Sequence, residues 1–209
     1  MILSQEKAIE ITLNQLFKDA KNDYYKIAKG LVKSAFRPMQ PSDFKEAYLS
    51  ISKEQGADLQ ELILKNNSKN IIEFGTSFGI STLFLAQGVL ATGGKIITTE
   101  LIESKALKAI DNFKNAGVQN LIEVRIGDAL ETLKNHAKSI DLLFLDGWKD
   151  LYLPLFEMLA PNFHINTIIY VDNANMLDAK TFLQTISKNK KYQLQPKFGG
   201  KVVLITIIK

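Results

Sequence analysis

The chain has 209 residues, of which 46% are hydrophobic and 23% are charged, and its formal net charge at pH 7 is +4. These values are ordinary for a single globular domain, and no stretch approaches the roughly 18 consecutive apolar residues that a membrane span requires. The lack of cysteine excludes a disulfide framework, a thiolate zinc site and a cysteine nucleophile. Because the first ten residues lack the basic and apolar regions of a secretory signal, we expect a cytoplasmic protein with no membrane partner.

The N-terminal third is predicted to be mainly helical. Apolar residues recur at helical spacing through residues 5–35, with a break near Asn22. The following segment, 37–43, contains two prolines and is expected to form a loop that starts a new helix near Phe44. A further helix is predicted over 56–65, directly before the first strand.

From residue 70 onward, strand patterns alternate with helical patterns. Strands are predicted at 70–75, 95–100, 121–126, 140–146, 166–172 and 201–208. Helices are predicted between them at 79–90, 103–115, 128–137, 149–159 and 177–187. This alternation predicts a parallel sheet with helices on both faces, and a short glycine turn before the last run favours an antiparallel edge strand there. We expect one α/β domain in which residues 1–66 form a helical cap on a core formed by residues 67–209.

The stretch NIIEFGTSFGIS, residues 70–81, joins the first core strand to its helix through a turn that contains Gly75 and Gly79. Glycine adopts positive φ angles and lets a ligand approach the backbone closely, so this turn suggests a small molecule lying against the main chain. An ordinary strand-to-helix turn is the alternative. The turn lacks the GxGxxG spacing of nicotinamide-binding folds.

Five predicted strand ends in succession carry glycine or acidic residues. They are Gly75, Glu100, Gly127-Asp128-Ala129, Asp146-Gly147 and Asp172-Asn173. In a doubly wound sheet the ligand lies beyond the carboxyl ends of the strands, and an acid at the second strand end can bind the ribose hydroxyls of a nucleotide. Helix capping explains a single acid at such a place. Five in the same topological position favour a binding site.

Asp146, Asp172 and Asn173 indicate a metal site. If strands 140–146 and 166–172 are neighbours, two carboxylates and an amide converge as three oxygen ligands. Such a set suits Mg²⁺ or another hard divalent cation. The alternative is that Asp146 caps the next helix and that Asp172 and Asn173 form a turn.

Together these motifs resemble the small, cation-dependent S-adenosylmethionine O-methyltransferases, the family that includes catechol O-methyltransferase. The resemblance covers about residues 40–209, and its most specific piece is FLDGWKDLYLP, residues 144–154. It implies the class I methyltransferase fold, a Rossmann-like doubly wound sheet of seven strands with the last antiparallel. The chain departs from the family at residues 161–164, where a glycine pair is usual, and at 199–201, where the catechol enzyme presents a substrate-orienting carboxylate.

The resemblance also implies a role for each candidate residue. S-adenosylmethionine would be bound by Glu73, Gly75, Ser81, Glu100, Asp128, Ala129, Asp146 and Trp148. Within this set, Gly75 and Ser81 would hold the methionine moiety, Glu100 the ribose, and Asp128, Ala129 and Trp148 the adenine. Mg²⁺ would be held by Asp146, Asp172 and Asn173. Lys149 would be the general base, and Asp146 the second catalytic residue.

The function implied is transfer of a methyl group from S-adenosylmethionine to a hydroxyl of a small acceptor, expected to be a phenol or vicinal diol, with help from a divalent metal. A tRNA with a hydroxylated base is an alternative acceptor. From another class, a non-catalytic S-adenosylmethionine- or nucleotide-binding protein is the alternative, although a pure binder has no need of the metal set. The sequence leaves the acceptor, the physiological metal and the oligomeric state open, with a homodimer as one arrangement considered.

Overall fold

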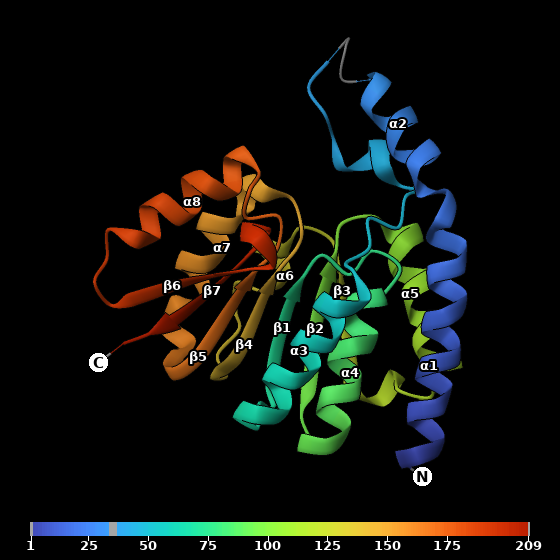
Figure 1. Ribbon diagram of the computed structural model, residues 1–209, viewed down its shortest axis with the longest axis horizontal. Helices are drawn as coiled ribbons and strands as arrows, with labels where there is room; N and C mark the ends of the chain where they lie inside the picture. The colour runs from blue at the N-terminus through green and yellow to red at the C-terminus, as the bar shows by residue number, and fades with distance from the viewer. Residues whose placement is uncertain (1, 34–36, 209) are drawn as a thin grey trace.

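A computed structural model describes residues 2–33 and 37–208 and places one seven-stranded sheet between two layers of helices (Figure 1). The strands are β1 (Asn70–Phe74), β2 (Lys95–Glu100), β3 (Ile122–Ile126), β4 (Ile140–Leu145), β5 (Phe163–Val171), β6 (Tyr192–Lys197) and β7 (Val202–Ile207). Their order in the sheet is β3-β2-β1-β4-β5-β7-β6. The first five strands are parallel, and β7 runs antiparallel to both β5 and β6. Strand order therefore reverses between β1 and β4, where a doubly wound sheet binds its ligand.

Eight α-helices are found within the described residues. They are α1 (Ile2–Asp19), α2 (Asp23–Lys33), α3 (Lys53–Asn66), α4 (Ile80–Thr92), α5 (Glu103–Asn115), α6 (Ala129–Thr132), α7 (Tyr152–Leu159) and α8 (Leu177–Ser187). Short 3₁₀ turns include η2 (Pro41–Phe44), η4 (Lys149–Leu151) and η6 (Phe198–Gly200). Throughout residues 2–33 and 37–208, every helix is too short or too polar to cross a membrane.

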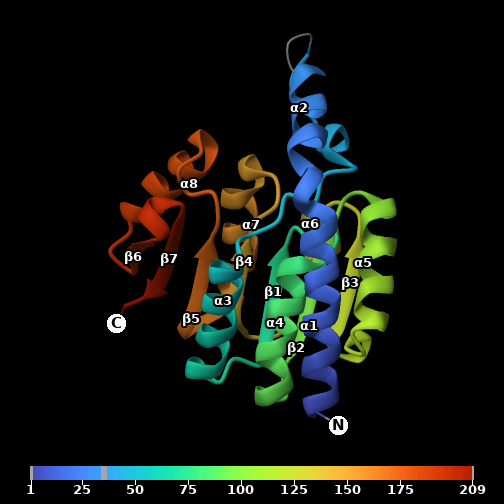
Figure 2. The ribbon, with the colours of Figure 1, turned by 45° about the vertical axis from the view of Figure 1, so that its right-hand side comes forward.

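The sheet has a separate apolar core on each face because successive strand residues point to opposite sides. On one face, Ile71 and Phe144 lie in a core built with α1, α3, α4 and α5. On the other face, Ile72 and Leu143 pack with α6, α7 and α8. The N-terminal helix α1 thus belongs to the body of the domain, whereas both views show α2 projecting away from the three layers (Figures 1 and 2).

The C-terminal part of the sheet differs from the sequence prediction in two ways. The seven strands that the resemblance implies are present, but the local pattern did not locate the strand β6 at Tyr192–Lys197, and the last strand is not at the edge, because β7 lies between β5 and β6. Edge strands are half solvated, and β6 accordingly alternates Tyr192 and Leu194 with exposed glutamines. Such a strand lacks the continuous apolar run that marks the strands buried on both faces.

Three helix predictions also need correction. Residues near Phe44 form the short 3₁₀ turn η2 and not the start of an α-helix. The helix α3 begins three residues earlier than predicted, since Ser52 Oγ accepts a hydrogen bond from Gln55 N–H and Gln55 Oε1 accepts one from Ser52 N–H, both at 3.2 Å. The helix predicted at 128–137 ends at Thr132, whose carbonyl accepts a hydrogen bond from Arg125 Nη1 at 2.8 Å.

Candidate active site

The glycine turn after β1 requires glycine at both positions, for different reasons. Gly75 has φ of +106°, and a Cβ atom there would lie 2.8 Å from the carbonyl carbon and oxygen of Asp146. Gly79, the N-cap of α4, has φ of +89°, and its Cβ would lie 2.4 Å from the Phe113 ring. Gly75 therefore lets the end of β1 approach the end of β4, and Gly79 lets the turn pack on α5.

Glu73 supports this turn from inside the protein. Its carboxylate is fully buried and accepts hydrogen bonds from Ser81 Oγ and Thr82 Oγ1 at 2.5 Å and from Thr98 Oγ1 at 2.6 Å. Burial raises the pKa of Glu73, while the three hydroxyl groups act to lower it. Glu73 and Ser81, both predicted to bind cofactor, thus lie beneath the turn and join β1 to α4 and β2. Direct contact of either with a cofactor stays a prediction.

Glu100, at the end of β2, presents a carboxylate that the backbone holds in place. Glu100 Oε2 accepts a hydrogen bond from Ser77 N–H, and Oε1 accepts one from Ile102 N–H, both at 2.8 Å. Its backbone carbonyl accepts a hydrogen bond from Gly127 N–H at 2.9 Å, which joins the ends of β2 and β3. The carboxylate therefore lies beside the glycine turn, where an acceptor for ribose hydroxyls is expected.

The segment 47–49 connects the first residue of α2 to the glycine turn through hydrogen bonds. Ser77 Oγ donates to the Tyr48 carbonyl at 2.8 Å, and Leu49 N–H donates to Asp23 Oδ2 at 2.9 Å. The buried Lys105 ammonium donates to the carbonyl of Ala47 at 2.8 Å, and burial lowers the pKa of Lys105 against the opposing effect of Glu100. Lys105 was not recognisable from the sequence, because its partners, the Ala47 carbonyl and Ser77 Oγ, lie in two segments distant along the chain.

The predicted metal residues lie together at the carboxyl ends of β4 and β5. The register pairs Leu145 with Val171, so that Asp146 and Asp172 follow on adjacent strands. Asp172 N–H donates to the Leu145 carbonyl at 3.0 Å. Asn173 has φ of +52°, a left-handed conformation that asparagine tolerates better than most residues. The expectation that these strands are neighbours is confirmed.

Asp146 lies in an environment that disfavours its negative charge. Burial raises the pKa of Asp146 to about 8; the nearby Lys149 ammonium acts to lower it and the Asp172 carboxylate raises it further. Lys149 Nζ lies 3.4 Å from Asp146 Oδ1 and donates to the Gly147 carbonyl at 2.8 Å. A cation bound beside Asp146 would favour the ionised form of its carboxyl group.

The donor set fits a hard divalent cation in its chemistry, with two carboxylates and one amide oxygen. The described residues hold no group of three or more His, Cys, Asp or Glu side chains arranged for a metal. A further contact was not predicted: Asp172 Oδ1 accepts a hydrogen bond from Gln55 Nε2 at 2.7 Å. Gln55 was not singled out from the sequence, because the helix was predicted to begin one residue after it.

The predicted adenine residues follow β3 and β4. Asp128 is the N-cap of α6, and its Oδ1 accepts a hydrogen bond from Leu130 N–H at 2.8 Å. Ala129 is buried in the second core, and Trp148 packs against the margin of that core. Ala129 and Trp148 therefore lie on the same side of the sheet, and contact of these three residues with adenine stays a prediction.

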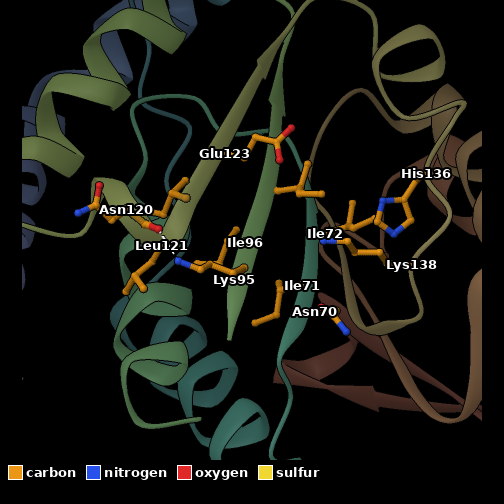
Figure 3. A pocket seen from close by; sticks show the side chains of 12 residues that line it. Asn70, Ile71, Ile72, Lys95, Ile96, Asn120, Leu121, Glu123, His136 and Lys138 are labelled. Carbon is orange, nitrogen blue, oxygen red and sulfur yellow. Dashed lines mark hydrogen bonds between the residues drawn. The ribbon is translucent and has the colours of Figure 1, made fainter. Parts of the chain in front are cut away.

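A pocket of about 270 Å³ lies at the opposite end of the sheet, at the amino ends of β1, β2 and β3 (Figure 3). Its lining includes Asn70, Lys95, Glu123, His136 and Lys138. Because the glycine turn and the four acidic strand ends lie at the carboxyl ends, this pocket is separate from the candidate active site.

The strand order, with an antiparallel β7 inserted between β5 and β6, and the site at the β1–β4 reversal define the class I methyltransferase fold. The family model described as O-methyltransferase matches residues 39–195. The chain belongs to the O-methyltransferase family.

Known relatives agree with this assignment. The chain is 33% identical over 129 residues to a catechol O-methyltransferase of Niastella koreensis, covering 60% of this chain and 58% of the relative. It is 31% identical over 132 residues to a caffeoyl-CoA O-methyltransferase of Medicago sativa, covering 60% and 53%. The chain thus spans less than two thirds of the length of these curated relatives.

Solved structures show the same fold. An O-methyltransferase from Bacillus cereus in complex with S-adenosylhomocysteine matches 89% of this chain and 99% of its own, with a TM-score of 0.68 and 24% identity. An S-adenosylhomocysteine-bound methyltransferase from Podospora anserina matches 86% and 88%, with a TM-score of 0.71 and 23% identity.

Proposed function

We propose that this protein transfers a methyl group from S-adenosylmethionine to a hydroxyl oxygen of a small acceptor, a phenol or vicinal diol, with assistance from a divalent cation. The observation that carries the proposal is the convergence of the Gly75 turn, Glu100, Asp146 and Asp172 at the strand-order reversal. Names of relatives support it, since catechol and caffeoyl-CoA O-methyltransferases are among them.

The glycine turn and Glu100 would bind the methyl donor. Gly75 leaves the backbone free of a side chain, and Glu100 offers carboxylate oxygens whose direction is fixed by two backbone N–H groups. Asp128, Ala129 and Trp148 would enclose the adenine. S-adenosylmethionine would supply a methyl group on a positively charged sulfur, so that an O–C bond forms as the S–C bond breaks and S-adenosylhomocysteine is released.

The residues at the carboxyl ends of β4 and β5 would bind the metal and deprotonate the acceptor. Asp146, Asp172 and Asn173 would hold the divalent cation, which when bound lowers the pKa of a hydroxyl group as it does that of water. Lys149 Nζ, placed beside Asp146 and the Gly147 carbonyl, would take the hydroxyl proton when it is in its neutral amine form. Fixing the two reactants in line contributes much of the rate, because the reaction then behaves as an intramolecular step.

Tritiated methyl transfer tests the proposal. The purified protein is incubated with labelled S-adenosylmethionine and, separately, a vicinal-diol phenol and total tRNA, with Mg²⁺ or with EDTA. We expect label in the phenol, lost in EDTA. Label in tRNA alone would replace the small acceptor with RNA. Equal transfer in EDTA would remove the metal from the mechanism, and binding of the donor without transfer to any acceptor would favour a non-catalytic binding protein.

A further inference from the structure

Lys201 places a positive charge beside one of the proposed metal ligands. It is the C-cap of η6, the turn between β6 and β7. Lys201 Nζ donates to Gln55 Oε1 at 2.6 Å and lies 3.9 Å from Asp172 Oδ1. Since Gln55 Nε2 donates to the same Asp172 oxygen, the side chains of Lys201, Gln55 and Asp172 form a closed group, which we call the Lys201 triad.

The backbone of Lys201 is fixed while its side chain has a path to solvent. The Lys201 carbonyl accepts a hydrogen bond from Ala174 N–H at 2.8 Å, one residue beyond Asn173, and Lys201 N–H donates to the Phe198 carbonyl at 3.2 Å. The Lys201 side chain is 39% exposed, whereas that of Asp172 is 3% exposed. The ammonium can therefore leave the triad by side-chain rotation alone, and Asp172 stays in place.

Each carboxyl group of the proposed metal site has a lysine side chain beside it. Two carboxylates, of Asp146 and Asp172, face two ammonium groups, of Lys149 and Lys201, at 3.4 Å and 3.9 Å. A divalent cation bound to Asp172 would add two positive charges close to the Lys201 ammonium. Like charges a few ångströms apart repel, and the repulsion is stronger beside a buried carboxyl group such as that of Asp172 than it is in bulk water.

We propose that the Lys201 ammonium lies beside Asp172 when no metal is bound and competes with the divalent metal for this carboxylate. The ammonium must move into solvent when the metal binds. The inference rests on the proposed function for its choice of metal ligands. Lys201 is then a residue that sets metal affinity: a metal concentration sufficient to displace its ammonium is needed before Asp172 becomes available.

Mn²⁺ titration, followed by the electron paramagnetic resonance signal of the free ion, tests the competition. Lys201→Met keeps most of the aliphatic stem and removes the charge. Lys191→Met is the matched control, because Lys191 is an exposed lysine just before β6 and its loss changes the net charge equally. We expect Lys201→Met to bind Mn²⁺ at least about tenfold more tightly than the wild type, and Lys191→Met to match the wild type. Equal affinity in all three proteins, or no Mn²⁺ binding by Lys201→Met, would overturn the inference.

Chemical labelling provides a second measurement on the unaltered protein. Reductive methylation of lysines, quantified by mass spectrometry, should modify Lys201 faster in saturating Mn²⁺ than in EDTA, while Lys191 reacts at the same rate in both. Protection of Lys201 by the metal would contradict the proposed displacement. Calorimetry with S-adenosylhomocysteine separates the two proposals: failure to bind it would contradict the methyltransferase function, and the Lys201 competition would still be decided by the Mn²⁺ titration.

Discussion

Replacing Gly75 by alanine should damage both stability and cofactor binding, because two penalties coincide at this position. The φ angle of +106° is one that non-glycine residues adopt only with strain, at a cost of about 1–3 kcal/mol. The new Cβ would also lie 2.8 Å from backbone atoms of Asp146, which cannot move aside as a flexible side chain can. Overpacking of this kind costs about 1–3 kcal/mol more.

Gly93→Ala provides the control. Gly93 has φ of +73° at the C-cap of α4, and no described atom lies within 4 Å of the position of its Cβ. This variant should therefore lose only about 1–2 kcal/mol of unfolding free energy, which is the cost of a left-handed backbone conformation for alanine. The difference between the two variants isolates the close approach of β1 to β4.

Urea unfolding and calorimetry with S-adenosylhomocysteine measure the two effects. We expect Gly75→Ala to lose about 2–6 kcal/mol of unfolding free energy in total and at least about tenfold in affinity, while Gly93→Ala binds like the wild type. If Gly75→Ala were no less stable than Gly93→Ala and bound with unchanged affinity, the structural reason given for this glycine would be wrong.

Three further predictions concern the acidic residues. Glu73→Ala should lose about 3 kcal/mol or more of unfolding free energy, because three buried hydroxyl groups lose their hydrogen-bond acceptor. Glu73→Gln should lose less, and urea unfolding compares the two variants. Although burial acts to raise the pKa of Asp141, hydrogen bonds from two backbone N–H groups and His164 lower it. The ionised Asp141 carboxylate therefore stabilises the fold fully above its ordinary pKa, and this stabilisation is lost as pH falls through the lowered pKa. Asp141→Asn should be less stable than the wild type at pH 7 and equally stable at low pH, as pH-dependent melting would show. Asp172→Ala should abolish metal-dependent transfer with little change in S-adenosylhomocysteine affinity, whereas Asp146→Ala should impair both, as parallel activity and calorimetric measurements would reveal.

Much of the fold followed from local patterns. The bounds of β2, α5 and α8 agree with the sequence prediction, because clear apolar periodicity is interrupted by glycine or polar turns on either side. The strand β6 was missed because it is half polar and contains Pro196, which an edge strand accommodates. Helix α6 was predicted too long, since the hydrogen bond from Arg125 that ends it comes from β3.

The candidate site was predictable to the extent that topology determines it. Parallel strand ends meet at one edge of a sheet, so that Asp146 and Asp172 were expected to be neighbours once the strands were recognised. The approach of Gln55 and Lys201 to Asp172 was not predictable, because it depends on how α3 and the β6–β7 hairpin pack against β5. Periodicity and spacing carry no information about such contacts between distant segments.

Calorimetric titration of the wild-type protein and Glu100→Ala with S-adenosylhomocysteine tests the central claim most directly. The site assigned to Gly75, Glu100 and Trp148 predicts micromolar binding by the wild type, weakened by roughly 1–3 kcal/mol in Glu100→Ala through loss of charged hydrogen bonds. No heat of binding with either S-adenosylhomocysteine or S-adenosylmethionine, together with binding of NAD, would contradict the cofactor assignment and the function built on it.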